Sequence, residues 1–238
     1  VNTALDDAAA FFTAKGLSDT ATEFDALKSN RDLAISTIQT AIDGIDAISE
    51  LVNQAKGLAS NAKATGNTSE RSTLAVQFNE LLSQINTIAN DSSFNGTNLL
   101  QATPDNLAVE FNTDNTSNLT ITGLDSTTAT SGINIAVAAN NFGLNANIDT
   151  ALTAISSALT TLRSNASTMG SRNTILSTRL EFTENLVNTL EGGTGKLTLA
   201  DLNEESANLL ALQTRQQLGI NSLALAAQSE RSILALFG

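Results

Sequence analysis

Carboxylates are the side chains of this sequence with which chemistry could be built. The chain holds 24 Asp and Glu residues but no histidine, cysteine, tryptophan or tyrosine. Histidine is the usual general base near neutral pH, and cysteine supplies thiolates for catalysis and for soft metals. Zinc sites, Cys–His pairs and Ser–His–Asp triads are therefore excluded, whereas paired-carboxylate chemistry and carboxylate calcium sites stay open.

Two acidic groups stand out, and both are better explained by helix starts than by ligands. The pair Asp6–Asp7 could hold a cation, but carboxylates also stabilise the first turn of a helix, and that interpretation is favoured. Asp201, Glu204 and Glu205 are likewise interpreted as first-turn charges of a final helix. Because no nucleophile motif is visible either, the sequence predicts a protein without catalytic residues, metal ions or cofactors, and an enzyme is the weakest hypothesis.

The charge balance restricts the partners. Twelve Lys and Arg residues oppose 24 Asp and Glu residues, which gives a formal net charge of −12. Binding to nucleic acid or insertion into a membrane is not expected of such a chain, and no apolar run approaches the ~20 residues of a membrane helix. The acidity is interpreted first as a source of solubility, and second as a repulsion that salt or packing must overcome before assembly.

Any functional side chains of this chain must be positioned by long helices, which are its main predicted elements. Between residues 32 and 62, apolar residues recur at steps of three or four, which places a narrow stripe on one helix face. A turn over residues 63–69, with Thr68 or Ser69 as the cap, leads into a second helix over residues 70–90. The two helices are predicted to form an antiparallel hairpin. The shaft core of the first helix is assigned to Ile35, Ile38, Ile42 and Ile45.

The middle of the chain changes to β structure. Residues 107–111 and 119–122 alternate between apolar and polar side chains, as strands do, and a polar loop joins them. Residues 133–137 are a candidate third strand. A tight structural turn precedes these segments, and its glycine supplies backbone freedom. The turn is assigned to Phe94, Asn95 and Gly96.

Two further helices complete the chain. Residues 146–190 repeat the apolar spacing, and the GGTG run at residues 192–195 is predicted to break that helix. A final helix is predicted from near Asp201 to Phe237. Each buried Leu or Ile is worth roughly 1.5–3 kcal/mol, and the final helix lacks a partner within the chain, so we expect it to be disordered until an assembly partner covers it. The returning shaft core is assigned to Leu152, Ile155, Leu159 and Leu162.

Several segments resemble bacterial flagellins. Residues 1–12 (VNTALDDAAAFF) are similar to the family's Asn-Ser-Ala-x-Asp-Asp-Ala-Ala segment, with Ala10 where a glycine is usual. Residues 92–101 (SSFNGTNLLQ) resemble its Phe-Asn-Gly-x-x-Leu-Leu turn and are the most specific short match. Residues 200–238 resemble its C-terminal helix. The resemblance spans nearly the whole chain and is weakest over residues 102–145.

The resemblance implies a structural subunit of the flagellar filament, which self-assembles through coiled-coil packing of its terminal helices into an extracellular motility filament. It implies export through the flagellar type III apparatus, in keeping with the lack of a Sec-type signal. The implied partners are other flagellin subunits in a homopolymer, the flagellar export chaperone, and the filament cap and hook-junction proteins. Filament packing and chaperone binding are assigned to Leu209, Leu212, Leu218, Leu223, Leu234 and Leu236.

Spacing and resemblance together predict a mainly α fold, with long antiparallel helices in a rod-like bundle and a small β-hairpin region in the middle of the chain. The family's first helix would precede Val1, and we expect its removal by cloning or proteolysis rather than a natural loss. The expected domains are an N-terminal connecting segment (1–31), a shaft helical hairpin (32–90), a small β region and short connection in place of the family's outer domains (91–145), a returning shaft helix (146–191), and a hinge with the C-terminal polymerisation helix (192–238).

Two other functions remain open from the sequence. A hook–filament junction protein of the same superfamily would cap the filament rather than extend it, but the ending SILALF, from Ser232 on, favours a flagellin. A cell-surface glycan-binding homologue would stack sugars on aromatic side chains, and an acidic, aromatic-poor chain argues against it.

Overall fold

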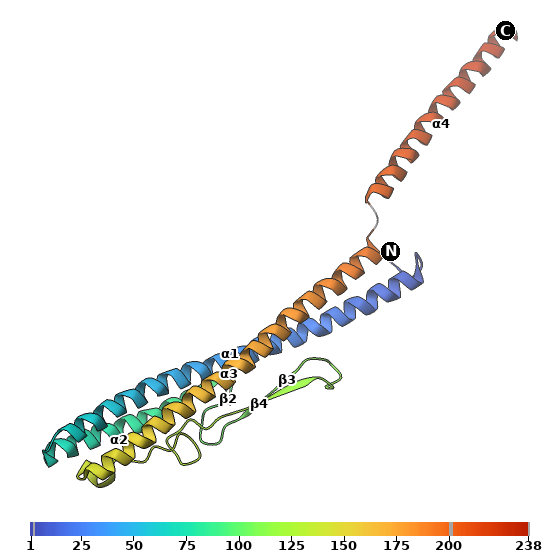
Figure 1. The fold of residues 1–238 in the computed structure, drawn as a ribbon. Helices are drawn as coiled ribbons and strands as arrows, with labels where there is room; N and C mark the ends of the chain where they lie inside the picture. Colours follow the sequence, from blue (N-terminus) through green and yellow to red (C-terminus); the bar gives the residue numbers. More distant parts are fainter. Residues whose placement is uncertain (2, 200–201, 238) are drawn as a thin grey trace. The chain divides into compact units, whose positions relative to one another are not determined.

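Four long helices account for most of the chain in a computed structural model, which describes residues 1, 3–199 and 202–237, except the side chains of 202–205 and 232–237. Two compact units are present, Thr20–Asn188 and the combination of Val1–Asp19 with Thr189–Gly238. The predicted fold class, mainly α with long antiparallel helices and small β-hairpins, is confirmed. In chain order the elements are α1 (Ala8–Ala64), α2 (Thr68–Asp91), β1 (Ser93–Phe94), β2 (Thr97–Asn98), β3 (Asn106–Glu110), β4 (Asn118–Thr122), the 3-10 helix η1 (Ala139–Phe142), α3 (Asn145–Thr198) and α4 (Leu202–Phe237) (Figure 1).

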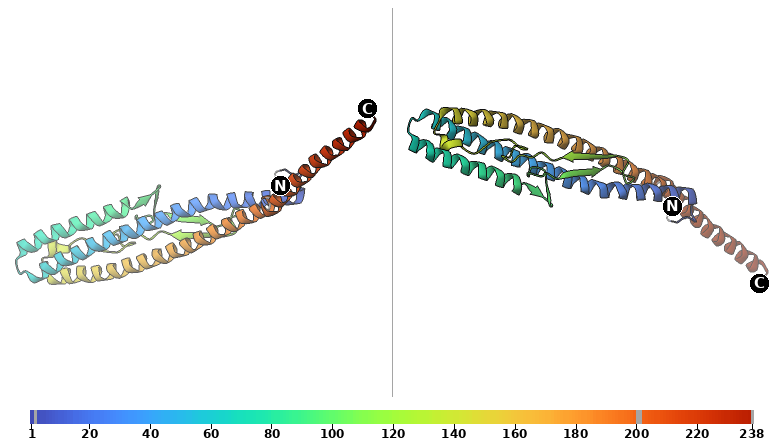
Figure 2. Two further views of the ribbon diagram at one scale, coloured as in Figure 1. Left: turned by 90° about the horizontal axis from the view of Figure 1, so that it is seen from above. Right: turned by 90° about the horizontal axis from the view of Figure 1, so that it is seen from below.

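One apolar core runs through the unit Thr20–Asn188, in which α1, α2 and α3 lie side by side (Figure 2). Steps of three and four residues keep each stripe on one helix face, so burial continues over many turns. The ring of Phe78 in α2 meets the ring of Phe142 in η1 edge to face, with 5.1 Å between the ring centroids. Of the residues assigned to the shaft core from the sequence, Ile38, Ile45, Ile155, Leu159 and Leu162 are buried, and Ile35, Ile42 and Leu152 are partly buried against them.

Helix α1 begins much earlier than the sequence predicts. It starts at Ala8, so residues 8–31 are helical rather than a connecting segment. Its buried stripe continues backwards through Leu27 and Ala21. Alanine stands out little from its neighbours in a hydropathy pattern, although it is an excellent helix former and packs closely. That is why the apolar spacing alone placed the start of the helix too late.

The cap of α2 also differs from the prediction. The side-chain Oδ1 of Asn67 accepts hydrogen bonds from the backbone N–H groups of Ser69 (2.9 Å) and Glu70 (3.4 Å). Thr68 and Ser69, the predicted caps, instead lie in the first turn of the helix. Asparagine is among the strongest N-cap residues, and here it takes the position that satisfies two free N–H groups.

The candidate third strand at residues 133–137 is not a strand, whereas β3 and β4 form the predicted antiparallel hairpin. The N–H of Ile133 donates to the carbonyl of Thr127 (2.8 Å), within its own loop. The next residue, Asn134, has φ of 51°, which interrupts an extended backbone. Local loop contacts have therefore replaced the strand pairing that the apolar pattern predicts.

The GGTG run does not break α3, which continues to Thr198. A Cβ on Gly193 would lie 3.3 Å from the side chain of Leu17, so the missing side chain permits a close approach of α1 within this unit. The hydroxyl of Thr194 donates to the carbonyl of Leu190 (3.0 Å) and lies 3.4 Å from the carbonyl of Ala14. Close helix packing thus offsets the low helix propensity of glycine, and the predicted break is wrong.

Two glycines of α1, Gly44 and Gly57, provide a test of how closely the core packs against this helix. A Cβ on Gly44 would lie 2.8 Å from Leu100 Cδ1 and 3.0 Å from Ser92 Cβ, whereas a Cβ on Gly57 would meet nothing within 4 Å. We expect Gly44→Ala to lower the free energy of unfolding by about 1–3 kcal/mol through overpacking. The matched control Gly57→Ala should raise it by about 0.5–1 kcal/mol through helix propensity. Urea denaturation followed by circular dichroism measures both, and equal effects would contradict this description of the core.

Candidate interaction surface

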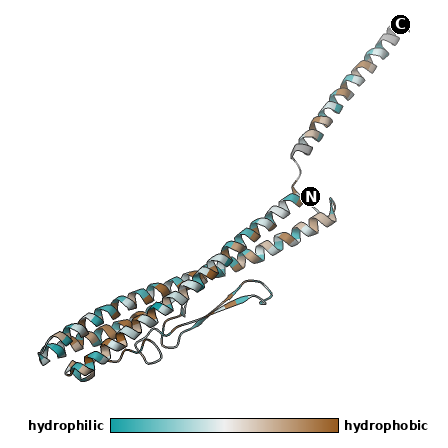
Figure 3. Cartoon of the chain, viewed as in Figure 1, coloured by the Kyte–Doolittle hydropathy of each residue, from teal (hydrophilic) through white to brown (hydrophobic). Residues whose placement is uncertain are grey.

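Helix α4 presents its apolar side chains to solvent. Every side chain described in α4, from Ser206 to Arg231, is exposed. Brown and teal residues alternate along the coloured part of the helix in Figure 3, so apolar groups are spread over that part. Of the residues assigned to filament packing, Leu209, Leu212, Leu218 and Leu223 are each more than half exposed, and the side chains of Leu234 and Leu236 lie outside the described residues.

The apolar side chains of α4 form two stripes on opposite sides of the helix. Because an α-helix turns by about 100° per residue, residues 209, 212, 220 and 223 fall on one side and residues 210, 218 and 225 on the other. A helix that is apolar on two sides is typical of one that is covered by more than one neighbour. The first stripe is Leu209, Leu212, Ile220 and Leu223, and the second is Leu210, Leu218 and Leu225, all exposed.

The acidic pair near the start of the chain forms backbone hydrogen bonds. Asp7 Oδ1 accepts from the N–H of Ala10 (3.0 Å) at the start of α1, and Asp6 Oδ2 accepts from the N–H of Thr3 (3.0 Å). Among the side chains that the structure describes, no three carboxylates gather as ligands for a metal ion. No described helix has the length and apolarity needed to cross a membrane. The other acidic group, Asp201, Glu204 and Glu205, lies outside the described side chains.

The residues assigned to the structural turn, Phe94, Asn95 and Gly96, lie where β1 leads into β2. Asn95 and Gly96 have φ of 50° and 80°, the left-handed region that glycine tolerates best. The buried Asn98, which sequence reasoning missed, holds this hairpin to the end of α2. Its amide nitrogen donates to the carbonyls of Ala89 (2.9 Å) and Asn90 (2.8 Å), and its Oδ1 accepts from the N–H groups of Leu100 (2.8 Å) and Gln101 (3.0 Å).

Arg31 is a buried cation that joins three elements. It is 1% exposed and lies on the core side of α1. Its Nη1 donates to the hydroxyl of Thr183 in α3, and its Nη2 donates to the carbonyl of Phe111, just after β3, at 3.0 Å. Its guanidinium lies 5.3 Å from the centroid of the Phe111 ring. The burial of Arg31 could have been inferred from the sequence, because position 31 falls four residues after Leu27 on the buried stripe.

Arg179 of α3 places a second cation on the same ring, 4.8 Å from the centroid of Phe111. Burial, and then the positive charge of Arg179, lower the pKa of Arg31. Neither guanidinium forms an ion pair with any carboxylate that the structure describes. The Nε of Arg31 also has no partner. A local excess of positive charge therefore exists in a chain whose net charge is −12.

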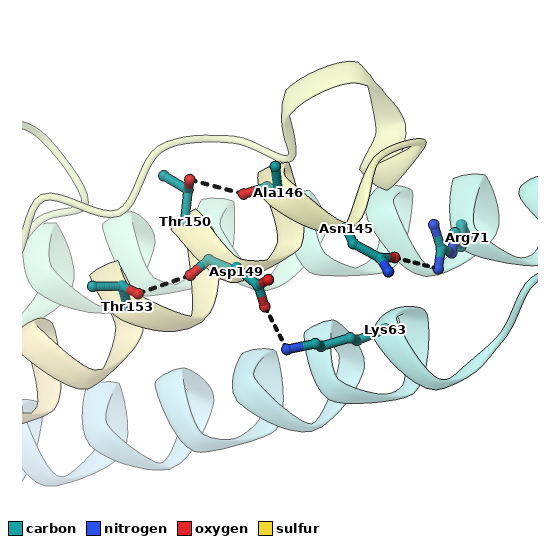
Figure 4. Close-up of polar contacts among 7 residues, drawn as sticks. All are labelled: Lys63, Arg71, Asn145, Ala146, Asp149, Thr150 and Thr153. Carbon is teal, nitrogen blue, oxygen red and sulfur yellow. Dashed lines mark hydrogen bonds and ion pairs between the residues drawn. The ribbon is translucent and has the colours of Figure 1, made fainter.

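A polar cluster closes the other end of the core, where α1 turns into α2 and α3 begins (Figure 4). Arg71 donates from Nε to the carbonyl of Thr65 (2.8 Å) and from Nη2 to Asn145 Oδ1 (2.6 Å). The ammonium of Lys63 lies 2.6 Å from a carboxylate oxygen of Asp149, but both side chains are about half exposed, so this ion pair contributes little. Arg71 is buried and is the main link between the helix ends.

The chain matches known sequences over almost its full length. Residues 1–105 match the bacterial flagellin N-terminal helical region, and residues 152–237 match the bacterial flagellin C-terminal helical region. Flagellin FljM of Caulobacter vibrioides is 36% identical over 244 residues, which cover 100% of this chain and 86% of that protein. A flagellin of Brucella melitensis is 31% identical over 214 residues, covering 86% of this chain and 75% of that protein.

A solved structure supports the fold. The crystal structure of Bacillus cereus flagellin superposes with a TM-score of 0.56 at 21% identity, over 65% of this chain and 88% of that one. At this identity the likeness concerns the fold alone. It shows that the fold of about two thirds of this chain recurs in that protein.

The Arg31 contacts lead to a test of how the β3–β4 hairpin is held. Arg31→Ala leaves the hydroxyl of Thr183 and the carbonyl of Phe111 without their donor. We expect the free energy of unfolding to fall by about 2–4 kcal/mol, since hydrogen bonds from a charged donor are lost in the interior. Arg163→Ala, on an exposed position of α3, should change it by less than about 0.5 kcal/mol.

Urea denaturation of both variants, followed by circular dichroism, measures this difference. Arg31→Met keeps the volume of the side-chain stem and separates packing from hydrogen bonding. If Arg31→Ala proved as stable as Arg163→Ala, the guanidinium would have no structural role.

Proposed function

Because this chain belongs to the bacterial flagellins, it is a structural subunit of the flagellar filament and not an enzyme, and we propose that the two stripes of α4 join it to neighbouring subunits. Flagellins polymerise with other flagellin subunits. The observation that supports the proposal is the exposure of every described side chain of α4, leucines included. A long helix that is apolar on opposite sides is typical of one that neighbours cover.

The energetics favour a role for both stripes. The described large apolar side chains of α4 leave much area to be buried, at roughly 1.5–3 kcal/mol for each fully covered Leu or Ile. Association costs translational and rotational freedom, and ordering a helix costs conformational entropy. One stripe alone offsets part of that cost, and two stripes on opposite sides place the helix between two neighbours. Coiled-coil packing of terminal helices would provide such an arrangement.

The same stripes are a hazard before assembly, because exposed apolar surface promotes aggregation. We propose that the flagellar export chaperone covers α4 inside the cell, through the leucines that later pack in the filament. Export through the type III apparatus would then deliver the subunit to the outside, where the filament grows. The filament cap and the hook-junction proteins are the proposed partners at the two ends of the filament.

No observation favours the alternative functions. The relatives that cover most of this chain are named flagellins rather than junction proteins or glycan-binding proteins. The junction-protein and glycan-binding functions are therefore not favoured.

Paired substitutions test whether both stripes of α4 are needed. Leu209→Gln with Leu223→Gln removes the first stripe, and Leu218→Gln with Leu225→Gln removes the second. Two buried leucines are worth roughly 3–6 kcal/mol, so each pair should raise the critical concentration for polymerisation by more than about a hundredfold. Sedimentation and negative-stain microscopy of seeded samples measure this, and Asn221→Gln is the exposed, polar control on the same helix.

Circular dichroism should show unchanged folding of the remaining chain in these variants. If only one pair had an effect, α4 would have a single neighbour. If neither pair had an effect, α4 would not be the joining surface.

Chaperone binding is tested separately from polymerisation. In a pull-down with the export chaperone of the same bacterium, deletion of residues 201–238 should abolish capture, and the two paired-glutamine variants should weaken it. The apolar side chains supply most of the buried area in such helix–groove complexes. Unchanged capture after the deletion would place the chaperone site elsewhere in the chain.

A further inference from the structure

A second, exposed stripe runs along α3 within the unit Thr20–Asn188. Arg172, Ile175, Arg179 and Phe182 follow one another at steps of three, four and three residues, so they share one side of the helix. We call these four residues the α3 face. Ile175 is 41% exposed and Phe182 is 61% exposed. The buried stripe of the same helix, which includes Leu176 and Thr183, lies next to the α3 face.

The composition of the α3 face is that of a protein–protein contact. Arginine and aromatic residues are enriched at the centres of interfaces and contribute a large share of binding energy there. An exposed phenylalanine and isoleucine on both sides of an arginine supply apolar area around a charge. A solvated helix surface would instead be expected to carry polar and charged side chains on this side.

Arg179 is held in place before any partner arrives. Its guanidinium lies on the ring of Phe111, 4.8 Å from the centroid, and Phe111 is itself buried. The hydroxyl of Thr183 donates to the carbonyl of Arg179 (2.9 Å) and accepts a hydrogen bond from Arg31. An arginine stacked on a fixed ring loses little conformational freedom on binding, so more of the contact energy remains for affinity.

The charge around Arg179 is not neutralised within the chain. Arg31 lies against the same ring, 5.3 Å from its centroid, and raises the local positive potential. Neither Arg172 nor Arg179 forms an ion pair with a carboxylate in the described part of the chain. A partner of the α3 face should therefore bring carboxylates.

A second copy of the chain carries such carboxylates. Helix α1 has exposed acidic residues that repeat at close to whole helical turns, so they line one side of it. We call them the α1 face, and they are Asp25, Asp32, Asp43, Asp46 and Glu50. Lys28 lies on the same side of α1 but is paired with Glu184 of α3 at 3.0 Å, so the α1 face keeps a net negative charge, complementary to the α3 face. A filament subunit always meets copies of itself.

We propose that the α3 face of one subunit binds the α1 face of another, with Arg179 as the central cation and Ile175 and Phe182 as the apolar border. The contact rests on the filament function and is separate from the stripes of α4. It provides a local attraction between subunits that repel each other through a net charge of −12. Because the attraction is strongest where the opposite charges align, the contact also orients the two helices.

Charge reversal tests the contact in the full chain. Arg179→Glu should raise the critical concentration for polymerisation about tenfold, because an attraction becomes a repulsion. Arg163→Glu is the matched control: it makes the same change of net charge on an exposed residue about 160° around α3. It should change the critical concentration less than about twofold.

Salt should reduce the difference between the two variants, because the screening length falls from about 10 Å at 0.1 M to about 3 Å at 1 M. Equal critical concentrations for Arg179→Glu and Arg163→Glu at low salt would overturn the proposal. If Arg179→Glu weakened capture by the export chaperone but left polymerisation unchanged, the α3 face would belong to the chaperone and the proposal would also fail.

Disulfide trapping identifies the partner directly, since the chain has no cysteine of its own. Ile175→Cys protein is mixed with protein that carries Asp32→Cys, Asp43→Cys or Glu50→Cys. Any mixed disulfide then joins two molecules. At least one of these mixtures should cross-link well above the control Lys56→Cys, an exposed position on another side of α1.

The trapping experiment distinguishes failure of the α3–α1 contact from failure of the filament function. Filaments without any mixed disulfide, or with Ile175→Cys joined only to itself, would overturn the contact while the filament function stands. A mixed disulfide in a protein that never forms filaments would support the contact and count against the α4 proposal.

Discussion

Burial of one narrow stripe per helix is the constraint on which the rest of this structure depends. Along α1, isoleucines and alanines at steps of three and four residues are covered by α2 and α3, and Ala55, Ala59 and Ala62 are fully buried near the turn. Small side chains there let neighbouring helices approach closely, and dispersion and area burial then act over many turns. Because each stripe covers only one side, the other sides of the helices are left for solvent or for other subunits.

Polar contacts fix the register that apolar burial leaves loose. Arg31, Arg71 and Asn98 are buried, and each ties together segments that are distant in the sequence. An apolar stripe can slide by a turn with little loss, whereas a buried donor that misses its acceptor costs the full desolvation of both groups. The helices supply most of the burial energy, and these few side chains select one arrangement of them.

Two surfaces of different character remain once the core is formed. The stripes of α4 are apolar, and salt does not weaken the burial of such area by screening. The α3 face and the α1 face are charged, and their attraction depends on the ionic strength of the medium. An acidic subunit gains from having both, because long-range repulsion keeps free subunits apart while short-range contacts hold them once they are aligned.

The sequence by itself determined the class of function and the existence of the elements. Missing histidine and cysteine removed most catalytic chemistry, apolar spacing located the helices and the β3–β4 hairpin, and the Phe-Asn-Gly turn pointed to the flagellins. These features are local, since each depends on residues a few positions apart.

Only the tertiary structure decided that the GGTG run is helical, that residues 133–137 are not a strand, and that Arg31 is buried. Each of those outcomes depends on a residue far away in the chain or on a specific backbone angle: Leu17 beside Gly193, Phe111 and Thr183 around Arg31, and the left-handed Asn134. Spacing records which side of a helix is buried, but not which distant side chain covers it, and that pairing is what sets the energy of these sites.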